Sequence, residues 1–295
     1  ARKRGARTRE LNACTMNIQP CKEFTTCEKK GFCPIKDDMD PFVYPLLREA
    51  DVVVPASPVF FYNVTAQLKA LIDRSQTLWA RNYRLGLTDP NRKMRRGFIL
   101  SQGATRGKNL FLGVDLTAKY FFDAVGASHE GSLYYWRIEH RGDMETHPTV
   151  REDVAAAVDR LLAPFMGRRK VLFVCRDNAC LSQMAGALAR IDGGDKLDVS
   201  VAGVTAADAI DPTMEKAMAE KGIDMGFRIP RTVTSVLAEE TPERIITLGP
   251  EPFHVESSET RIEHWTVSPP EGADTPAMLG IFNDLEQRIR KLITE

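Results

Sequence analysis

Residues 51–74 read DVVVPASPVFFYNVTAQLKALIDR, and their pattern decides the fold of the first half of the chain. A β-branched run ends at Ser57, because Pro58 lacks a backbone N–H and disfavours helical geometry in the residue before it. Aromatic residues follow, and apolar side chains then recur at helical spacing, as at Val64 and Leu68. The stretch therefore predicts a buried parallel strand, a loop and an amphipathic helix.

The loop after this strand combines polar groups with flat apolar surface. The backbone offers amides from Val59 onward, and Ser57 offers a hydroxyl. The aromatic residues are Phe60, Phe61 and Tyr62. In open α/β sheets, ligands bind at the carboxyl edge, where such loops lie. The loop is therefore a candidate site for a flat heteroaromatic ring with a polar rim, whereas the alternative is a corner of core aromatic residues.

Three segments carry a resemblance to known flavoproteins: SPVF at 57–60, VTAQLK at 64–69 and IDR at 72–74. They resemble the flavin loop of the NADPH-dependent FMN reductase and iron-sulfur flavoprotein families, which have a flavodoxin-like fold. The resemblance implies bound FMN, with NAD(P)H as the electron donor. Phe60 stands where the family usually has Tyr, so a hydroxyl is lost and the stacking surface is kept. The cofactor-binding residues that it implies are Ser57, Pro58, Val59, Phe60, Phe61 and, after the next strand, Gly103.

Residues 1–8 resemble the loop that wraps the FMN phosphate in these families. The residues to which the resemblance assigns that role are Arg2, Lys3, Gly5 and Thr8. An exposed basic tail is the alternative. Only a few residues separate Thr8 from Met16, although a parallel crossover needs a dozen or more. We therefore expect a break in the chain between Thr8 and Met16, and a first strand before Ala1.

Cys21, Cys27 and Cys33 lie close together in the chain, a spacing typical of a metal or cluster site in a cytosolic protein. In the iron-sulfur flavoproteins, this segment carries four Cys that hold a [4Fe-4S] cluster. Phe24 stands at the second of these positions and cannot ligate iron, which leaves three thiols, with Cys14 as a distant substitute. We favour a loop of free thiols over a cluster.

Length, charge and cysteine content limit the class of protein. A chain of 295 residues exceeds one ordinary core, so two domains are expected. Forty basic residues balance forty acidic ones, and no apolar run is long enough to span a membrane. Nothing in these numbers indicates a nucleic acid or membrane partner, and we expect a homo-oligomer. Six Cys in a chain of this size fit a reducing, cytoplasmic environment.

A linker is indicated at residues 163–169, where Pro, Gly and paired Arg follow a helical pattern. A new α/β pattern then starts, with a strand at 171–174, a helix at 184–191 and a loop that begins at Cys175. A Cys in this place faces the amides of the helix N-terminus, which stabilise a thiolate and bind anions. We therefore expect two domains, residues 1–166 and residues 167–295.

The loop reads CRDNACLSQ at 175–183 and closely resembles the Cys-x5-Arg-Ser loop of low-molecular-weight tyrosine phosphatases and arsenate reductases. The resemblance continues through VAGV at 201–204, IDP at 210–212 and MAEKGID at 218–224, and covers most of residues 170–295. The expected fold class is therefore α/β, with two doubly wound parallel-sheet domains, the first flavodoxin-like and the second phosphatase-like.

The resemblance fails at the catalytic positions. Leu181 replaces the Arg that grips the oxyanion, and leucine offers no donor. Ser268 replaces the Asp that acts as general acid, and serine cannot protonate a leaving group near neutral pH. The additional Cys of thioredoxin-coupled arsenate reductases is absent at 247–249. The candidate catalytic residues that remain are Cys175 and Cys180, with Asn178 and Ser182 in support.

Three interpretations of the second domain stay open. It is a docking or dimerisation module, a dithiol in which Cys175 and Cys180 exchange electrons with the flavin, or, least favoured, an active phosphatase or arsenate reductase. For the whole chain, the sequence favours an FMN-dependent oxidoreductase that passes electrons from NAD(P)H to a small-molecule or protein acceptor. A protein that uses FMN as a sensor or structural ligand is the alternative.

Overall fold

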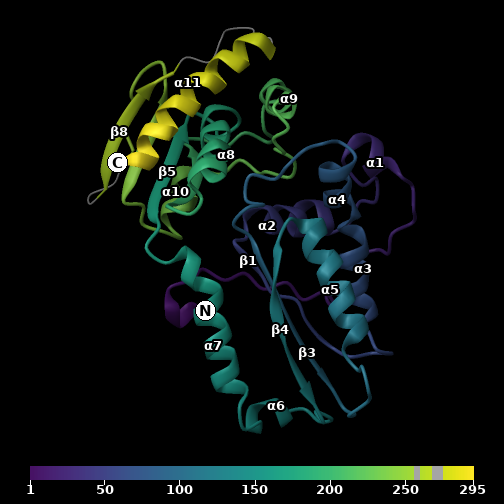
Figure 1. Ribbon diagram of the computed structural model, residues 1–295. Coiled ribbons are helices and arrows are strands. Elements are labelled where there is room, and N and C mark those ends of the chain that lie inside the picture. The colour runs from purple at the N-terminus through teal and green to yellow at the C-terminus, as the bar shows by residue number, and fades with distance from the viewer. Residues whose placement is uncertain (256–259, 268–274) are drawn as a thin grey trace. The chain divides into compact units, whose positions relative to one another are not determined.

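The computed structural model describes residues 1–255, 260–267 and 275–295. The chain divides into two compact units (Figure 1). The first unit comprises Ala1–Gly86 and Met94–Met166, and the second comprises Leu87–Lys93 and Gly167–Glu295. In the part of the chain that is described, no helix combines the length and the apolar character needed to cross a membrane.

The first unit is built on a parallel sheet of four strands. The strands are β1 (Val52–Val53), β2 (Ala56–Pro58), β3 (Arg96–Gly103) and β4 (Ser128–Trp136). β4 pairs along one side of β3, while β1 and β2 follow each other along the other side. The register places Pro58, Gln102 and Tyr135 beside one another where the strands end. The loops that follow β2, β3 and β4 therefore leave the same carboxyl edge.

Helices cover both faces of this sheet. The helical elements are η1 (Arg2–Arg4), α1 (Thr26–Lys30), η2 (Met39–Val43), α2 (Tyr44–Glu49), α3 (Ala66–Arg74), α4 (Gln76–Tyr83), α5 (Leu112–Val125), α6 (Asp143–Thr146), α7 (Val150–Leu162) and η3 (Ala163–Phe165). On one face, Ala157 and Leu161 of α7 pack against Phe98 of β3. Figure 1 shows α3, α4 and α5 together on the opposite face.

The strand, loop and helix predicted for residues 51–74 are present, but the strand is only partly buried, since Ala56 and Pro58 are exposed. The strand is interrupted around Pro55, which has no backbone N–H to offer to a neighbouring strand. The helix α3 begins after Thr65, whose side-chain oxygen accepts a hydrogen bond from Leu68 N at 3.4 Å. This side chain satisfies one of the amides that a helix leaves open at its N-terminus.

The predicted break between Thr8 and Met16 is wrong. The backbone runs without interruption through this segment, where Thr15 N and Met16 N both donate to Asn12 O at 3.0 and 3.2 Å. Among the described residues, no strand precedes β1. The segment therefore has no parallel crossover to make, and the dozen residues that a crossover needs are not required.

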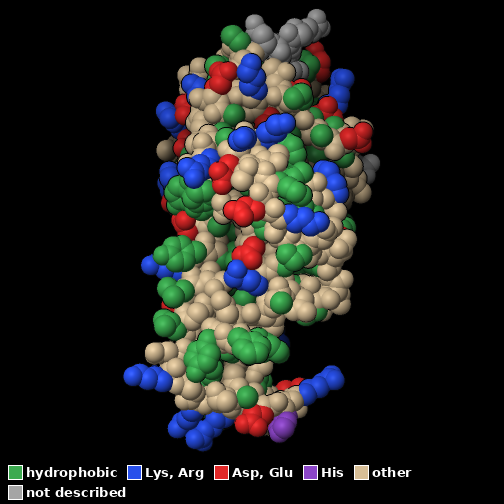
Figure 2. All heavy atoms as spheres, turned by 90° about the vertical axis from the view of Figure 1, so that its right-hand side faces the viewer, with side chains coloured by type: hydrophobic (Ala, Val, Ile, Leu, Met, Phe, Trp, Pro, Cys, Tyr) green, Lys and Arg blue, Asp and Glu red, His purple; other side chains and the backbone are tan. Residues whose placement is uncertain are grey.

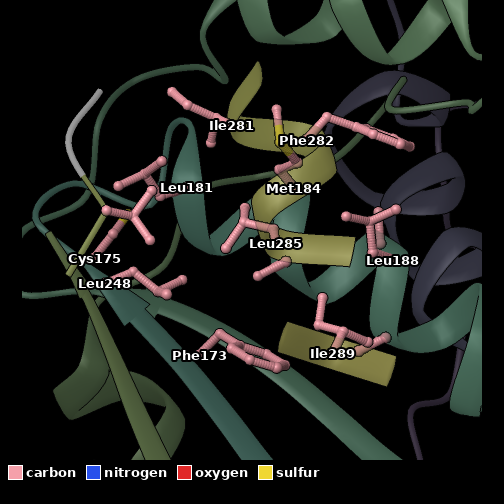
Figure 3. Packing of buried hydrophobic residues seen from close by; sticks show 14 of the residues in the cluster. Phe173, Cys175, Leu181, Met184, Leu188, Leu248, Ile281, Phe282, Leu285 and Ile289 are labelled. Atoms are coloured by element: carbon pink, nitrogen blue, oxygen red, sulfur yellow. The ribbon is translucent and has the colours of Figure 1, made fainter. Parts of the chain in front are cut away.

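The second unit contains a parallel sheet of four strands in the order β6-β5-β7-β8. Its strands are β5 (Arg169–Cys175), β6 (Leu197–Gly203), β7 (Arg244–Gly249) and β8 (Arg261–Thr266), and its helices are α8 (Leu181–Gly193), α9 (Pro212–Glu220), α10 (Val233–Leu237) and α11 (Thr275–Thr294). In the main cluster, Phe173 of β5 packs with Leu188 of α8 and Leu285 of α11 (Figure 3). A smaller cluster with Val236 of α10 covers the other face. The predicted α/β class with parallel sheets is confirmed.

A short arm from the first half of the sequence completes the second unit. Leu87–Lys93 lies between α4 and β3 in the chain but belongs to the second unit. Thr88 N donates to Gly222 O at 2.8 Å, and Asp224 N donates to Thr88 O at 2.9 Å. Sequence patterns did not indicate this arm, because it carries no periodic apolar residues.

Candidate flavin and thiol sites

An aromatic turn stands at the carboxyl edge, directly after β2. Phe60 N donates to Asn63 O at 2.8 Å, and Asn63 N donates to Phe60 O at 2.9 Å. Between them, Phe61 and Tyr62 have φ of 47° and 62°, the left-handed region that hairpin turns usually fill with Asn or Gly. Each such residue costs about 1–2 kcal/mol. Backbone strain of this kind is concentrated at ligand sites and switch regions.

The turn presents its rings to solvent. The exposed fractions of Phe60, Phe61 and Tyr62 are 57%, 100% and 51%. The interpretation of these residues as core aromatics is therefore wrong. Beneath the turn, a Cβ on Gly113 of α5 would lie 2.3 Å from Tyr62 O, so only glycine allows the helix to support the turn this closely.

Ser57 is buried, with 6% of its surface exposed, and it forms hydrogen bonds with other residues of the chain. Its hydroxyl donates to Pro58 O at 2.8 Å and accepts from Thr65 N at 3.0 Å. Its carbonyl accepts from Ser101 Oγ of β3 at 2.8 Å. These three bonds fix the start of the loop, so the structure gives Ser57 a role in positioning the aromatic turn.

The loop after β3 lies against the aromatic turn. A Cβ on Gly103 would lie 2.8 Å from Leu110 Cδ2 and 3.6 Å from Val59 Cβ, so Gly103 stands beside the start of the loop after β2. A Cβ on Gly107 would lie 2.9 Å from the Tyr62 hydroxyl. Of the predicted cofactor residues, the structure therefore brings Val59, the aromatic turn and Gly103 together at one edge.

Gln102 leaves a buried acceptor at this edge. Its Oε1 is buried and has no hydrogen-bond partner among the described residues. An unsatisfied buried carbonyl costs about 1–3 kcal/mol, and such groups in native proteins usually have a reason in ligand binding or bound water. Aromatic faces for stacking, a glycine that permits close approach and a free acceptor for a ring N–H together fit an isoalloxazine.

The basic turn at residues 2–8 lies elsewhere. Arg2 Nε donates to Thr8 Oγ1 at 2.5 Å, and Arg4 forms a two-bond pair with Asp159 of α7 at 2.6 and 3.0 Å. The next residue on α7, Arg160, lies over the ring of Phe98 in β3. Phe98 is five residues before Gly103, the last residue of this strand. Figure 1 shows the N-terminus beside α7. The structure therefore places this turn at α7, where Arg4 pairs with Asp159, and does not bring Arg2, Lys3, Gly5 and Thr8 to the aromatic turn.

The cysteines at 21, 27 and 33 differ in their environments. Cys21 is exposed, Cys27 is half-buried and Cys33 is buried. Burial, and then the neighbouring Cys33, raise the pKa of the Cys27 thiol, which opposes the thiolate that a metal needs. Within the described ranges, no group of three or more His, Cys, Asp or Glu side chains is arranged to hold a metal ion. The donors present among the described residues do not fit a [4Fe-4S] cluster.

The thiol loop of the second unit joins β5 to α8. Cys175 ends β5, is 3% exposed, and its Sγ lies 3.0 Å from Ser182 Oγ. Asn178 Nδ2 donates to Ser182 Oγ at 2.7 Å, while Asn178 Oδ1 accepts from Gln183 Nε2 at 3.1 Å and from the N–H of Arg231 at 2.9 Å. This network holds Asn178 at a φ of 58°, which Asn tolerates better than most residues. The support predicted for Cys175 is thus present.

Gly203 of β6 allows the thiol loop to close. A Cβ at this position would lie 2.6 Å from Asn178 N and 2.2 Å from Thr205 O, both backbone atoms. Thr205 N in turn donates to Arg176 O at 2.9 Å. Since backbone atoms cannot move aside as a flexible side chain can, any larger residue at Gly203 displaces the loop.

Leu181 faces the core rather than the loop. It is 4% exposed and belongs to the same cluster as Cys175, Met184 and Leu248 (Figure 3). The place that holds a guanidinium in the phosphatase family is therefore filled by an apolar side chain. Ser268, which stands where that family has its general acid, lies outside the described residues.

Cys180 is a poor partner for thiol exchange. Its Sγ contacts Met278 Sδ at 3.7 Å. Burial, then the Asp211 carboxylate and Cys175, raise the pKa of the Cys180 thiol to about 12. A thiol exchanges or attacks as its thiolate, so a proton that stays bound through the neutral range suppresses both reactions.

Alkylation tests this environment. At pH 8 we expect iodoacetamide to modify Cys180 at least about a hundredfold more slowly than an exposed thiol with the usual pKa of about 8.5. Mass spectrometry of peptides with Cys180 and with the exposed Cys14 measures the two rates in one sample. Because the folded state keeps this proton up to a pKa of about 12, its contribution to stability is complete below about pH 8.5 and is lost as the pH rises. Equal rates for the two thiols at pH 8 would contradict the assignment.

Fold and sites thus define a chain that joins a flavodoxin-like unit with an aromatic turn to a phosphatase-like unit with a buried thiol loop. Residues 1–96 match the family of NADPH-dependent FMN reductases, and residues 170–295 match the family of low molecular weight phosphotyrosine protein phosphatases. Each half of the chain thus matches a different family, as the resemblances in its sequence predict.

Individual proteins match one half each. An iron-sulfur flavoprotein of Methanosarcina thermophila is 39% identical over 106 residues, 36% of this chain and 51% of that protein. A putative arsenate reductase of Halobacterium salinarum is 29% identical over 128 residues, 42% of this chain and 89% of that protein. A crystal structure of an arsenate reductase from Archaeoglobus fulgidus is 30% identical, with coverage of 42% and 99% and a TM-score of 0.39. The chain spans about half the length of this iron-sulfur flavoprotein.

Proposed function

We propose that the first unit is an FMN-dependent oxidoreductase that takes electrons from NAD(P)H and passes them to a small-molecule or protein acceptor. The observation that carries this proposal is the strained aromatic turn, whose rings are exposed at the strand edge where Gln102 pairs with Pro58. The match to the FMN reductase family supports it. The alternative, an FMN sensor, uses the same site but no electron donor.

The chain supplies orientation, while the flavin, when bound, supplies hydride and electron transfer. Phe60, Phe61 and Tyr62 offer apolar faces for the ring. Gln102, whose buried Oε1 has no partner among the described residues, would offer an acceptor to a ring N–H if its side chain turned toward the ring. Gly107 lets the neighbouring backbone approach, since a larger residue would meet the Tyr62 hydroxyl. These residues would hold the ring in one orientation, which is the positioning that transfer between a donor and an acceptor requires.

Removing a ring from the turn tests the site. We expect Phe61→Ala to weaken FMN binding about tenfold, because a stacked aromatic pair is worth about 0.5–1.5 kcal/mol beyond its burial. Titration of the apoprotein with FMN, followed by flavin fluorescence, measures the change. Phe42→Ala is the matched control, since Phe42 is also an exposed phenylalanine, at 54%, on η2. Anaerobic NADPH or NADH should then bleach the bound flavin of the wild type.

Two results would contradict these proposals. If the wild type does not bind FMN tightly, the proposed flavin site is wrong. FMN that binds but stays oxidised with both NADPH and NADH would favour the sensor over the oxidoreductase.

For the second unit, we propose that it serves as a docking or dimerisation module and does not hydrolyse phosphate esters. The buried Leu181 at the position of the family's guanidinium carries this proposal. The high pKa of Cys180 argues against the alternative in which Cys175 and Cys180 exchange electrons with the flavin.

We further propose that the chain forms a homo-oligomer through α5. Leu112, Leu116 and Tyr120 are four residues apart along this helix and 55%, 49% and 67% exposed. They form one stripe, and Leu116 and Tyr120 also form part of the wall of a groove lined by Ile72 and Trp79. Figure 2 views the side of the molecule that carries α3, α4 and α5, where hydrophobic side chains lie among charged ones. A stripe beside a groove allows two copies to exchange the same surface about a two-fold axis.

A charge in the stripe tests the interface. We expect Leu116→Glu to convert the wild-type oligomer to monomer, because an unpaired carboxylate would be buried between the copies. Size-exclusion chromatography with light scattering measures the mass. Lys30→Glu, an exposed change of charge on α1, should leave the oligomer intact. A monomeric wild type at micromolar concentration would contradict the proposal.

A further inference from the structure

Two unpaired cations stand on the loop after β3. Residues 104–109 read ATRGKN, so Arg106 and Lys108 flank Gly107 and the loop holds no acidic residue. Arg106 and Lys108 are both exposed. Among the described residues, neither has an ion pair or a hydrogen-bond partner. In Figure 2, Lys and Arg side chains extend from the end of the molecule where the strands of the first unit finish.

These cations are beside the aromatic turn. Gly107, which lies between them in the chain, is the residue whose Cβ would lie 2.9 Å from the Tyr62 hydroxyl. The loop has a fixed path, because Leu110 N donates to Gly107 O at 3.2 Å and Leu112 N donates to Asn109 O at 3.0 Å. A ligand whose ring lies on the turn therefore has two positive charges next to it.

The other charges at this edge come from the loop after β4. Arg137 follows Trp136, which pairs with Gly103, and this loop carries two exposed cations, Arg137 and Arg141. The acidic residues of that loop are Glu139 and Asp143. The Asp143 carboxylate accepts from the backbone N–H groups of Glu139 and His140 at 2.9 and 2.8 Å, so it is held within its own loop. The loop after β3 is therefore the positively charged side of the site.

We propose that Arg106 and Lys108 bind the phosphomonoester of a nucleotide whose ring lies on the aromatic turn, an inference that rests on the proposed flavin site. A phosphomonoester dianion is complementary to a guanidinium fork and an ammonium that one short loop carries two residues apart. In the basic turn at residues 2–8, Arg4 pairs with Asp159 of α7. Arg106 and Lys108 would therefore bind the phosphate in place of Arg2 and Lys3, to which the resemblance assigned that role. The phosphate comes either from FMN or from the 2′-position of a dinucleotide donor.

The experiment compares ligands that differ only in the phosphate. In the full chain, Arg106→Gln, Lys108→Gln and the double variant are measured for the Kd of FMN and of riboflavin, and for kcat/KM with NADPH and with NADH. Lys30→Gln, an exposed cation on α1, is the control. Arg106→Lys keeps the charge but loses the fork, so its effect should be smaller than that of Arg106→Gln.

Two ratios are compared: the affinity for FMN over that for riboflavin, and kcat/KM with NADPH over that with NADH. We expect each single variant to lower one of these ratios about tenfold, and the double variant to lower it about a hundredfold. A loss of FMN over riboflavin preference identifies the flavin phosphate, whereas a loss of NADPH over NADH preference identifies the dinucleotide phosphate. Both ratios within twofold of the wild type, with riboflavin binding intact, would overturn this inference alone. A wild type that binds neither flavin would overturn the proposed flavin site and this inference with it.

Discussion

Purified protein should hydrolyse p-nitrophenyl phosphate no faster than background. An anion near Cys175 would meet no guanidinium from position 181, because Leu181 is buried in the apolar core. Removing one preorganised transition-state donor costs about 100- to 1,000-fold in rate. The family's general acid is lost as well, and such an acid contributes about 100- to 10,000-fold. Together these losses amount to at least about four orders of magnitude, so Cys175→Ser should have the same rate as the wild type.

Restoring both groups is the sharper form of the experiment. Leu181→Arg combined with Ser268→Asp should raise turnover by at least about a hundredfold over the wild type. The variant should also be less stable, because the new side chain leaves the cluster that Leu181 shares with Met184 and Leu248. Strong wild-type activity that disappears in Cys175→Ser would contradict the proposal and show that another cation, such as Arg176, serves the loop.

Replacing Arg95 should destabilise the first unit by about 3–5 kcal/mol, because each of three carbonyls left without a donor costs about 1–3 kcal/mol when buried. Arg95 is fully buried at 0% exposure. Its guanidinium donates to Ala50 O at 2.9 Å, Val125 O at 2.7 Å and Arg48 O at 3.0 Å. These carbonyls lie at the C-terminal ends of α2 and α5, where helices leave carbonyls without partners. One side chain therefore ties two helix ends to the start of β3.

Arg95→Met retains much of the volume and removes every donor, so it isolates the polar contribution. Arg95→Lys should be intermediate, because an ammonium on a flexible stem cannot reach all three carbonyls in one plane. Arg151→Met on the exposed side of α7 is the control and should change stability by at most about 0.5 kcal/mol. Urea denaturation followed by circular dichroism measures the difference. A loss below about 1 kcal/mol in Arg95→Met would show that water replaces the guanidinium at these helix ends.

Short segments of the sequence predict much of the fold. The position of Pro58 after a β-branched run and the helical spacing that follows Thr65 predict β2 and α3, because both depend on backbone restrictions and on side-chain periodicity within a few residues. The order of Cys175, Asn178 and Ser182 likewise predicts a loop with a supported thiol, and the hydrogen bonds among them are present. The sequence alone also shows that position 181 lacks a hydrogen-bond donor for an anion, since leucine has none in any conformation.

Other features depend on which distant segments meet, and only the tertiary structure decides them. The exposure of Phe61, the unpartnered Gln102 Oε1 and the high pKa of Cys180 follow from packing by residues far away in the chain. The turn at residues 2–8 resembles a phosphate loop, yet Arg4 binds Asp159, 155 residues further along. The sequence therefore determined the elements and the chemical groups that they carry, whereas tertiary packing decided which of those groups share an edge, because burial and long-range ion pairs have no local pattern.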